Sequence, residues 1–139
     1  MRIESGKWIM EGGKLGVENG KKNIVQEKSF AFALRVVKLS KFLMAEKKEF
    51  VISKQVLRSG TAIGALIREA EHAQSKADFI NKMSIALKEA NETDYWIELL
   101  FQSKEISEGA YHSIQPNIQE LIKLLVSIVK TSKEDKHEK

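Results

Sequence analysis

The sequence has no cysteine among its 139 residues and only one proline. Without cysteine, no disulfide framework, thiolate nucleophile or thiolate metal site can form, and the chain fits a reducing compartment. No uninterrupted run of about eighteen apolar residues occurs, and the N-terminal residues lack the apolar segment of a signal peptide. We therefore expect a cytoplasmic protein that does not associate with membranes.

Aromatic residues are also scarce, at 7% of the chain, whereas 42% of the residues are hydrophobic. Alanine, leucine, isoleucine, lysine and glutamate are abundant, and these residues favour helices. A chain of this length can bury one core but is too short for two ordinary domains. We expect a single all-α domain.

Glycine is concentrated near the N-terminus, where no hydrophobic period is sustained. We expect residues 1–26 to form a flexible leader in which Trp8, Ile9 and Met10 could dock, residues 27–131 to form the bundle domain, and the polar residues 132–139 to fray. Apolar spacing predicts helices from about residue 27, over 54–73, from 76 to about 104 and over 107–130. Four amphipathic helices with short connections predict an antiparallel up-down four-helix bundle.

Local signals suggest where these helices begin and bend. Ser53 is the expected N-cap of the second helix, and Ser75 with Asp78 forms a capping-box pattern for the third. Pro116 falls inside the fourth helix, where it should kink the helix or restrict its first part to a separate turn.

The first and third helices carry apolar residues beyond one core-facing stripe. Phe30, Leu34 and Phe42 fall outside the main stripe of the first helix, which predicts a second partner for that helix. On the third helix a second apolar line contains Ile85, Tyr95, Trp96 and Leu99. Tyr95, Trp96 and Leu99 are a candidate subunit interface, and the alternative is that they cover the flank of their own bundle.

Positive charge is modest overall, at +4, but it is unevenly distributed. Only two acids, Glu46 and Glu49, lie in the segment from residue 35 to residue 58, which carries a net charge of +5. This segment is a candidate for contact with the phosphates of a nucleic acid, and the alternative is an ordinary solvated surface. Its basic residues are Arg35, Lys38, Lys41, Lys47, Lys48, Lys54 and Arg58.

Gly60 and Gly64 lie four residues apart in the stretch RSGTAIGAL. A phosphate-binding P-loop requires a longer spacing, a lysine after the second glycine and a preceding strand, all of which are missing here. One helical turn apart, the two glycines instead favour close approach of a neighbouring helix. We therefore interpret them as helix-packing residues.

Glu69 and His72 form a Glu-x-x-His pattern that resembles half of a di-iron site. His112 has no glutamate at this spacing, and His137 lies in the polar tail that is expected to fray. No pattern identifies a nucleophilic triad. We expect no catalytic residues, no metal and no cofactor. Asp94 falls near the apolar stripe of the third helix and would need a partner if it is buried.

Three segments resemble a known bacterial family. They are LRSGTAIGA at residues 57–65, SKADFINKMSIALKEANETDYW at 75–96 and LIKLLVSIVKT at 121–131, within a similarity that covers about residues 27–132. The family consists of four-helix-bundle proteins encoded in intervening sequences of 23S ribosomal RNA genes. Ala62 and Leu66 stand where family members often carry serine and asparagine, which favours pure packing at these positions.

The resemblance implies a bundle that assembles into a ring, commonly a pentamer, with no established catalytic activity. It also implies a relationship to accessory proteins of diversity-generating retroelements, which bind a reverse transcriptase and nucleic acid through basic surfaces. Our hypothesis is a non-enzymatic homo-oligomer associated with RNA or another nucleic acid. The alternative is a scaffold that holds a polymerase or another enzyme through Tyr95 and Trp96 and does not itself bind nucleic acid.

Overall fold

The computed structural model describes residues 2–4, 7–9 and 15–136. Four helices make up most of these residues: α1 (Leu15–Glu46), α2 (Ile52–Ala70), α3 (Lys76–Gln102) and α4 (Glu108–Lys136). Two short strands, β1 (Arg2–Glu4) and β2 (Lys7–Ile9), precede them and pair in an antiparallel register that places Ile3 opposite Trp8. The bulk of the molecule is therefore all-α, as predicted, and the small sheet is an addition that the sequence did not predict.

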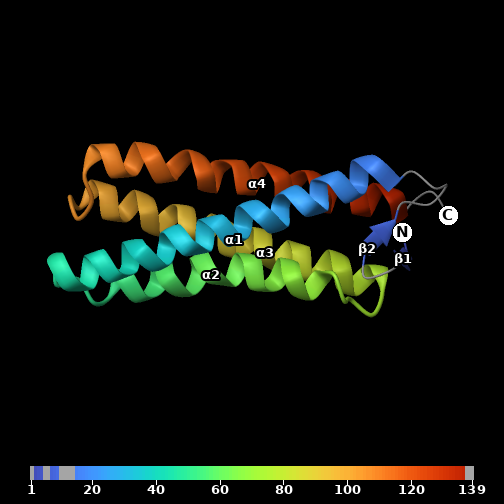
Figure 1. Ribbon diagram of the computed structural model, residues 1–139, viewed down its shortest axis with the longest axis horizontal. Helices are drawn as coiled ribbons and strands as arrows, with labels where there is room; N and C mark the ends of the chain where they lie inside the picture. Colours follow the sequence, from blue (N-terminus) through green and yellow to red (C-terminus); the bar gives the residue numbers. More distant parts are fainter. Residues whose placement is uncertain (1, 5–6, 10–14, 137–139) are drawn as a thin grey trace.

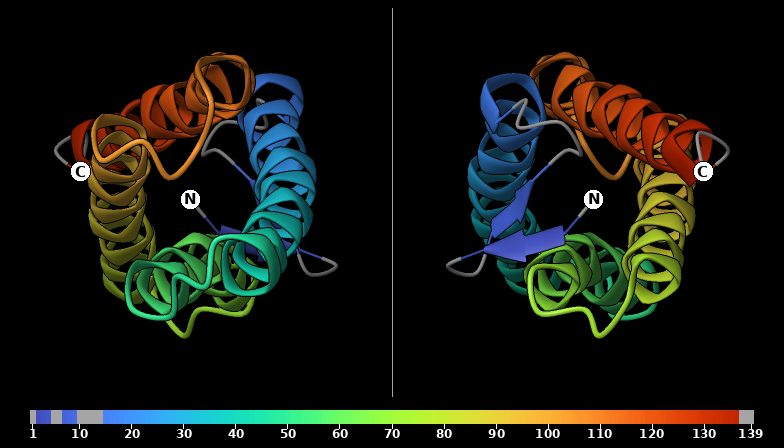
Figure 2. Two further views of the ribbon diagram at one scale, coloured as in Figure 1. Left: turned by 90° about the vertical axis from the view of Figure 1, so that its left-hand side faces the viewer. Right: turned by 90° about the vertical axis from the view of Figure 1, so that its right-hand side faces the viewer.

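The four helices enclose a common interior (Figure 2). Each helix packs against the helix before and after it in the chain, and α4 closes the arrangement by packing on α1. In Figure 1, α1 and α3 run from right to left, whereas α2 and α4 run from left to right. As a result, the α1–α2 and α3–α4 connections lie at the same end of the molecule, and β1 and β2 lie at the other.

The core consists of the apolar stripes that the helical period predicts on each helix. On α3 the buried residues include Phe79, Met83, Ala86, Ala90, Ile97 and Leu100, and on α4 they include Ile114, Ile118, Leu121, Leu125 and Ile128. Residues spaced three or four apart share one face of a helix, which is why these residues form one buried stripe on each helix. None of the described helices combines the length and the hydrophobicity needed to cross a bilayer.

Helix α1 begins at Leu15, about twelve residues before the predicted start near Glu27. Gly16 and Gly20 lie inside it. A glycine in a helix costs only about 1 kcal/mol relative to alanine, so a helix that is already nucleated can extend through two of them. Of the apolar residues expected to dock in the leader, Trp8 and Ile9 are part of β2, which contacts α1, and Met10 lies outside the described residues.

The start of α2 is capped by Glu49, not by the predicted Ser53. The Glu49 carboxylate accepts hydrogen bonds from the backbone N–H groups of Val51, Ile52 and Ser53 at 3.2, 3.0 and 2.7 Å. These donors have no partner within the helix, and a carboxylate at this position also interacts favourably with the helix dipole. Ser53 lies inside the helix and is buried.

The predicted cap of α3 is confirmed. The Ser75 hydroxyl accepts a hydrogen bond from the N–H of Asp78 at 3.0 Å, and the Asp78 carboxylate accepts one from the N–H of Gln74 at 3.1 Å. The two side chains together satisfy backbone donors on both sides of the cap, which is why the four-residue pattern from Ser75 to Asp78 predicted where the helix begins.

Helix α4 runs without interruption through Pro116, so the separate first turn does not form. Pro116 is exposed, which places its ring on the solvent side of the helix. The helix also continues to Lys136, six residues past the predicted end, and Ser132 is fully buried. A serine on the apolar face carries no hydrophobic signal, so the sequence pattern ended nearly two turns too early.

Candidate nucleic-acid interface

Five of the predicted basic residues are exposed lysines near the α1–α2 connection. Lys38 lies eight residues before the end of α1 at Glu46, a distance of about 12 Å along the helix axis, and the other four follow it closely. This connection lies at the left end of the molecule in Figure 1. The five residues are Lys38, Lys41, Lys47, Lys48 and Lys54.

The two arginines of the same segment are engaged with other helices. The Arg35 guanidinium donates hydrogen bonds to the Ser113 carbonyl at 2.9 Å, to the Ser113 hydroxyl at 2.8 Å and to the amide oxygen of Asn117. These contacts join α1 to α4. Arg35 is therefore less available to a phosphate than the lysines are.

Arg58 joins α2 to α3 through two carboxylates. Its guanidinium pairs with Glu89 at 3.2 Å and with Glu92, which also accepts a hydrogen bond from the indole N–H of Trp96 at 3.0 Å. The hydrogen bond that Arg58 donates to Glu92 is the main cause that raises the pKa of Arg58, and the hydrogen bond that Trp96 donates to Glu92 is the main cause that lowers the pKa of Glu92. Arg58 and Glu92 therefore both stay charged and remain paired with each other.

Lys104 adds a sixth exposed lysine to this end of the molecule. It lies in the α3–α4 connection, 46 residues after the last predicted basic residue, so no inspection of the charged segment could include it. The expected direction of the helices would have supplied the signal, because alternate connections in an up-down bundle share an end. We refer to Lys38, Lys41, Lys47, Lys48, Lys54 and Lys104 as the lysine end.

Lys48 and Lys104 both adopt the left-handed backbone conformation, with φ of 54° and 67°. Each follows a helix whose end is closed by a backbone hydrogen bond, from Glu49 N–H to the Leu43 carbonyl six residues earlier and from Glu105 N–H to the Leu100 carbonyl five residues earlier, both at 2.9 Å. Glycine is the usual residue at this position because a Cβ is unfavourable there. Lysine occupies both positions, although glycine there would make the folded protein more stable.

A groove of about 480 Å³ lies between the two connections at the lysine end. Leu39, Phe42 and Phe101 supply apolar walls, and Lys47 and Lys104 lie beside them. Glu105 and Glu108 also line the groove and reduce its positive charge. The lysine end therefore combines exposed cations with an exposed aromatic residue, Phe42, at 44% exposure.

The two glycines of α2 face α1 but differ in how closely it approaches. A Cβ built on Gly60 would lie 2.9 Å from both methyl groups of Val36, whereas one built on Gly64 would lie 3.5 Å from Ser29, an ordinary contact distance. Gly60 is thus required by the packing of α1 on α2, whereas Gly64 leaves space beside α1. Leu66, on the same helix, packs against the core.

The candidate interface residues of α3 differ in exposure. Tyr95 is 58% exposed and lies edge-on to Trp96, with ring centroids 5.0 Å apart. Trp96 and Leu99 are half-buried, and Trp96 packs against the core. Only Tyr95 therefore presents most of its surface to a partner.

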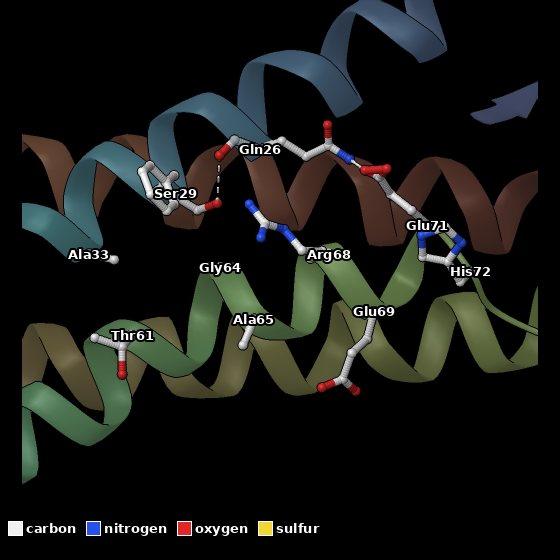
Figure 3. Close-up of a pocket in the computed structure, with 11 residues that line it drawn as sticks. Gln26, Ser29, Ala33, Thr61, Gly64, Ala65, Arg68, Glu69, Glu71 and His72 are labelled. Atoms are coloured by element: carbon white, nitrogen blue, oxygen red, sulfur yellow. Dashed lines mark hydrogen bonds between the residues drawn. The ribbon is translucent and has the colours of Figure 1, made fainter. Parts of the chain in front are cut away.

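Glu69 and His72 do not converge on a common point in the structure. Glu69 pairs with Lys82 at 3.5 Å, and Figure 3 shows the side chains of Glu69 and His72 pointing in different directions. Across the described residues, no group of three or more histidine, aspartate or glutamate side chains could hold a metal ion. His112 lies 4.0 Å from Glu108, and His137 lies outside the described residues.

Asp94 is half-buried between α3 and α4, and its hydrogen-bond partner is a side-chain amide and not a cation. Its carboxylate accepts a hydrogen bond from Gln119 at 3.0 Å. Burial raises the pKa of Asp94 and the nearby charge of Glu98 adds to this, whereas the hydrogen bonds from Gln119 and Gln115 oppose it. Next to it, the Tyr111 hydroxyl donates to Glu98 at 2.6 Å, which raises the pKa of Tyr111 to about 12.

Comparisons with known proteins agree with the fold and the sequence motifs. The chain is similar to a crystal structure of a protein of unknown function from the S23 ribosomal protein family of Bacteroides thetaiotaomicron, with 62% sequence identity and a TM-score of 0.78. The similarity covers 79% of this chain and 98% of that one. A comparison with curated proteins gave no match. Residues 21–127, well over half of the chain, match the model of one family, and the chain therefore belongs to the 23S rRNA-intervening sequence protein family.

Proposed function

We propose that this chain acts without catalysis, as a homo-oligomeric antiparallel up-down bundle whose lysine end contacts the phosphate backbone of RNA or another nucleic acid. The observation that supports it best is the convergence of six exposed lysines, five in or near the α1–α2 connection and one in the α3–α4 connection, on one end of the molecule. Attraction between such cations and phosphates does not depend on base sequence. A cytoplasmic location is part of the proposal, since the chain has no cysteine.

The acids of this end oppose phosphate binding to different degrees, and Glu105 and Glu108 line the groove beside Lys47 and Lys104. Glu49 is committed to three backbone N–H groups at the start of α2, so its charge is partly compensated there. Glu46 is exposed and remains as a competing charge on α1. A lysine without an ion pair in the protein gains more interaction energy from a phosphate than an arginine that is already paired. Within the described residues, the lysine end forms no ion pairs.

Two apolar surfaces support assembly into a ring. Leu34 on α1 is 52% exposed, and Tyr95 on α3 is 58% exposed. Helices α1 and α3 lie diagonally across the bundle (Figure 2), so the two surfaces belong to helices that are not neighbours. A ring requires two different surfaces on each subunit, because its contacts are head-to-tail. Five subunits is the number that the family resemblance implies.

Assembly would convert weak nucleic-acid binding by one lysine end into strong binding by the whole oligomer. A single lysine end carries few charges, but several copies on one particle bind one nucleic acid with a large gain in avidity. The proposal therefore predicts that RNA affinity depends on the oligomer as well as on the lysines.

Fluorescence anisotropy with a labelled RNA hairpin tests the proposal. Affinity should fall steeply as salt rises from about 50 to about 200 mM, because bound counterions are released on binding. Changing Lys47, Lys48 and Lys104 to glutamine should lower the slope of log affinity against log salt by about one unit per lost contact. Changing Lys130 and Lys133, two exposed lysines near the opposite end of α4, is the matched control and should leave the slope unchanged. Binding that is absent or insensitive to salt would contradict the proposal.

A second candidate function is a scaffold that holds a polymerase or another enzyme through the exposed Tyr95 beside Trp96. An exposed tyrosine on a rigid helix is a favourable anchor for a protein interface. Crosslinking and capture from the native host separate the two functions. Recovery of RNA that depends on the lysine end favours the first, and a stoichiometric enzyme that is lost with Tyr95→Ala favours the second.

A further inference from the structure

A second groove lies between α1 and α2, away from the lysine end (Figure 3). Its volume is about 660 Å³, within the range of small-molecule sites. Phe30, Ala33 and Ala65 supply apolar walls, and Arg68 and His72 supply polar groups. An apolar groove with few polar groups is the usual composition of a ligand site.

Gly64 forms part of this groove, and helix packing does not explain it. The nearest atoms to a Cβ at Gly64 would be the carbonyl oxygen and hydroxyl of Ser29 at 3.5 Å, so alanine would fit. Glycine is nevertheless unfavourable in a helix relative to alanine. Gly60, one turn earlier, is different because a Cβ there would collide with Val36. The absence of a side chain at Gly64 keeps the groove open.

Arg68 directs its guanidinium into the groove, toward α1, in Figure 3. The central guanidinium carbon lies 5.9 Å from the centroid of the Phe30 ring, which holds the cation beside an apolar surface. No ion pair of Arg68 occurs among the described residues, in contrast to Arg58, which has two. Arg68 is thus a cation held at the wall of a groove.

The two carboxylates of the groove each have a partner within the protein. Glu69 pairs with Lys82 at 3.5 Å, and Glu71 accepts a hydrogen bond from the side-chain amide of Gln26. Their negative charges still lie at the rim of the groove and repel a ligand with two negative charges. A single negative charge, matched to Arg68, is favoured over the double charge of a phosphate monoester.

We propose that the groove between α1 and α2 binds a small organic monocarboxylate with a flat apolar body. The carboxylate accepts hydrogen bonds from the Arg68 guanidinium, whose planar donors match its two oxygens. The apolar body lies over Gly64 between Phe30, Ala33 and Ala65. His72, at the mouth of the groove, offers an additional N–H donor. This site is separate from the proposed nucleic-acid interface and does not depend on it.

Titration of the ¹⁵N-labelled full chain with phenylacetate tests the site, with neutral phenylacetamide as the matched probe. Phenylacetate should shift the backbone signals of Gly64 and its neighbours with a Kd on the order of 1 mM, as expected for so small a ligand. Phenylacetamide, which keeps the ring and loses the charge, should bind about tenfold more weakly because it lacks a charge-assisted hydrogen bond. Equal binding of the two probes, or no shift at Gly64 with either one up to about 10 mM, would overturn the proposal.

Two variants locate the site without disturbing the core. Arg68→Gln should remove the preference for phenylacetate over phenylacetamide, because the neutral glutamine cannot form a charge-assisted hydrogen bond with the carboxylate. Arg68 is exposed, so this change does not alter the core. Ala65→Trp should block both probes, because Ala65 is exposed and its replacement fills the groove from the solvent side. Lys54→Gln, on the same helix but outside the groove, should change neither affinity. A preference that survives Arg68→Gln, or binding that survives Ala65→Trp, would also reject the site.

Discussion

At the scale of single residues, Gly60 and Gly64 form a natural matched pair. Gly64→Ala should stabilise the protein by about 1 kcal/mol, because the helix gains alanine propensity and the added methyl group meets Ser29 at ordinary contact distance. Gly60→Ala should destabilise it by about 1 kcal/mol or more, because Val36 is buried, stiff and 2.9 Å away. Urea unfolding at constant m-value measures both. Equal effects of the two variants would show that α1 adjusts to Gly60 freely.

Asp94 sets a second residue-scale prediction, which concerns pH. Its pKa is raised in the folded protein, so the stability it contributes is present below its unfolded pKa, near 4, and is lost as pH rises through the folded pKa. Asp94→Asn should therefore be more stable than the wild type at neutral pH, and this advantage should vanish in acid.

Glu98 is the matched control for Asp94, because its pKa is lowered, first by the hydrogen bond from Gln102 and then by that from Tyr111. Its stabilising contribution is present above its unfolded pKa and is lost as pH falls through the folded pKa. Glu98→Gln should thus have the opposite sign and be less stable than the wild type at neutral pH. Thermal unfolding at several pH values distinguishes the two, and the same sign for both variants would contradict this assignment.

At the scale of elements, the lysines that follow α1 and α3 are expected to lower the stability of the protein and to strengthen its binding to RNA. Lys48→Gly and Lys104→Gly should each stabilise the protein by about 1 kcal/mol, because glycine accepts the left-handed conformation without a Cβ penalty. The same variants should weaken RNA binding, since each removes a cation of the lysine end. Lys54→Gly is the control, because it loses the same charge inside α2 and should lower stability instead. Stabilised variants that bind RNA as tightly as the wild type would remove these lysines from the interface.

At the scale of the whole molecule, a head-to-tail ring makes a prediction that no symmetric dimer makes. Leu34→Glu and Tyr95→Glu should each convert the oligomer to monomers of 15.8 kDa, because each destroys one of two different surfaces. A mixture of the two variants should form a heterodimer of twice that mass, since each chain keeps the surface that the other has lost. Light scattering of the separate and mixed samples measures this. A wild-type chain of monomer mass, or a mixture that stays monomeric, would contradict the ring.

The sequence by itself determined that this chain is helical and where the core faces of α3 and α4 lie, through the periodic spacing of apolar residues, and it determined the cap of α3 through the pattern of Ser75 and Asp78. These properties depend on residues within one or two turns of each other, which is why a linear pattern contains them.

Only the tertiary structure decided which charged groups have partners and which glycine is required. Arg35 and Arg58 meet side chains that lie 78 and 31 or more residues away, and Lys104 joins lysines that are far from it in sequence. Gly60 and Gly64 are alike in sequence, but one faces Val36 and the other faces a groove. These outcomes follow from how one helix is placed along another, which side-chain spacing within a single helix does not determine.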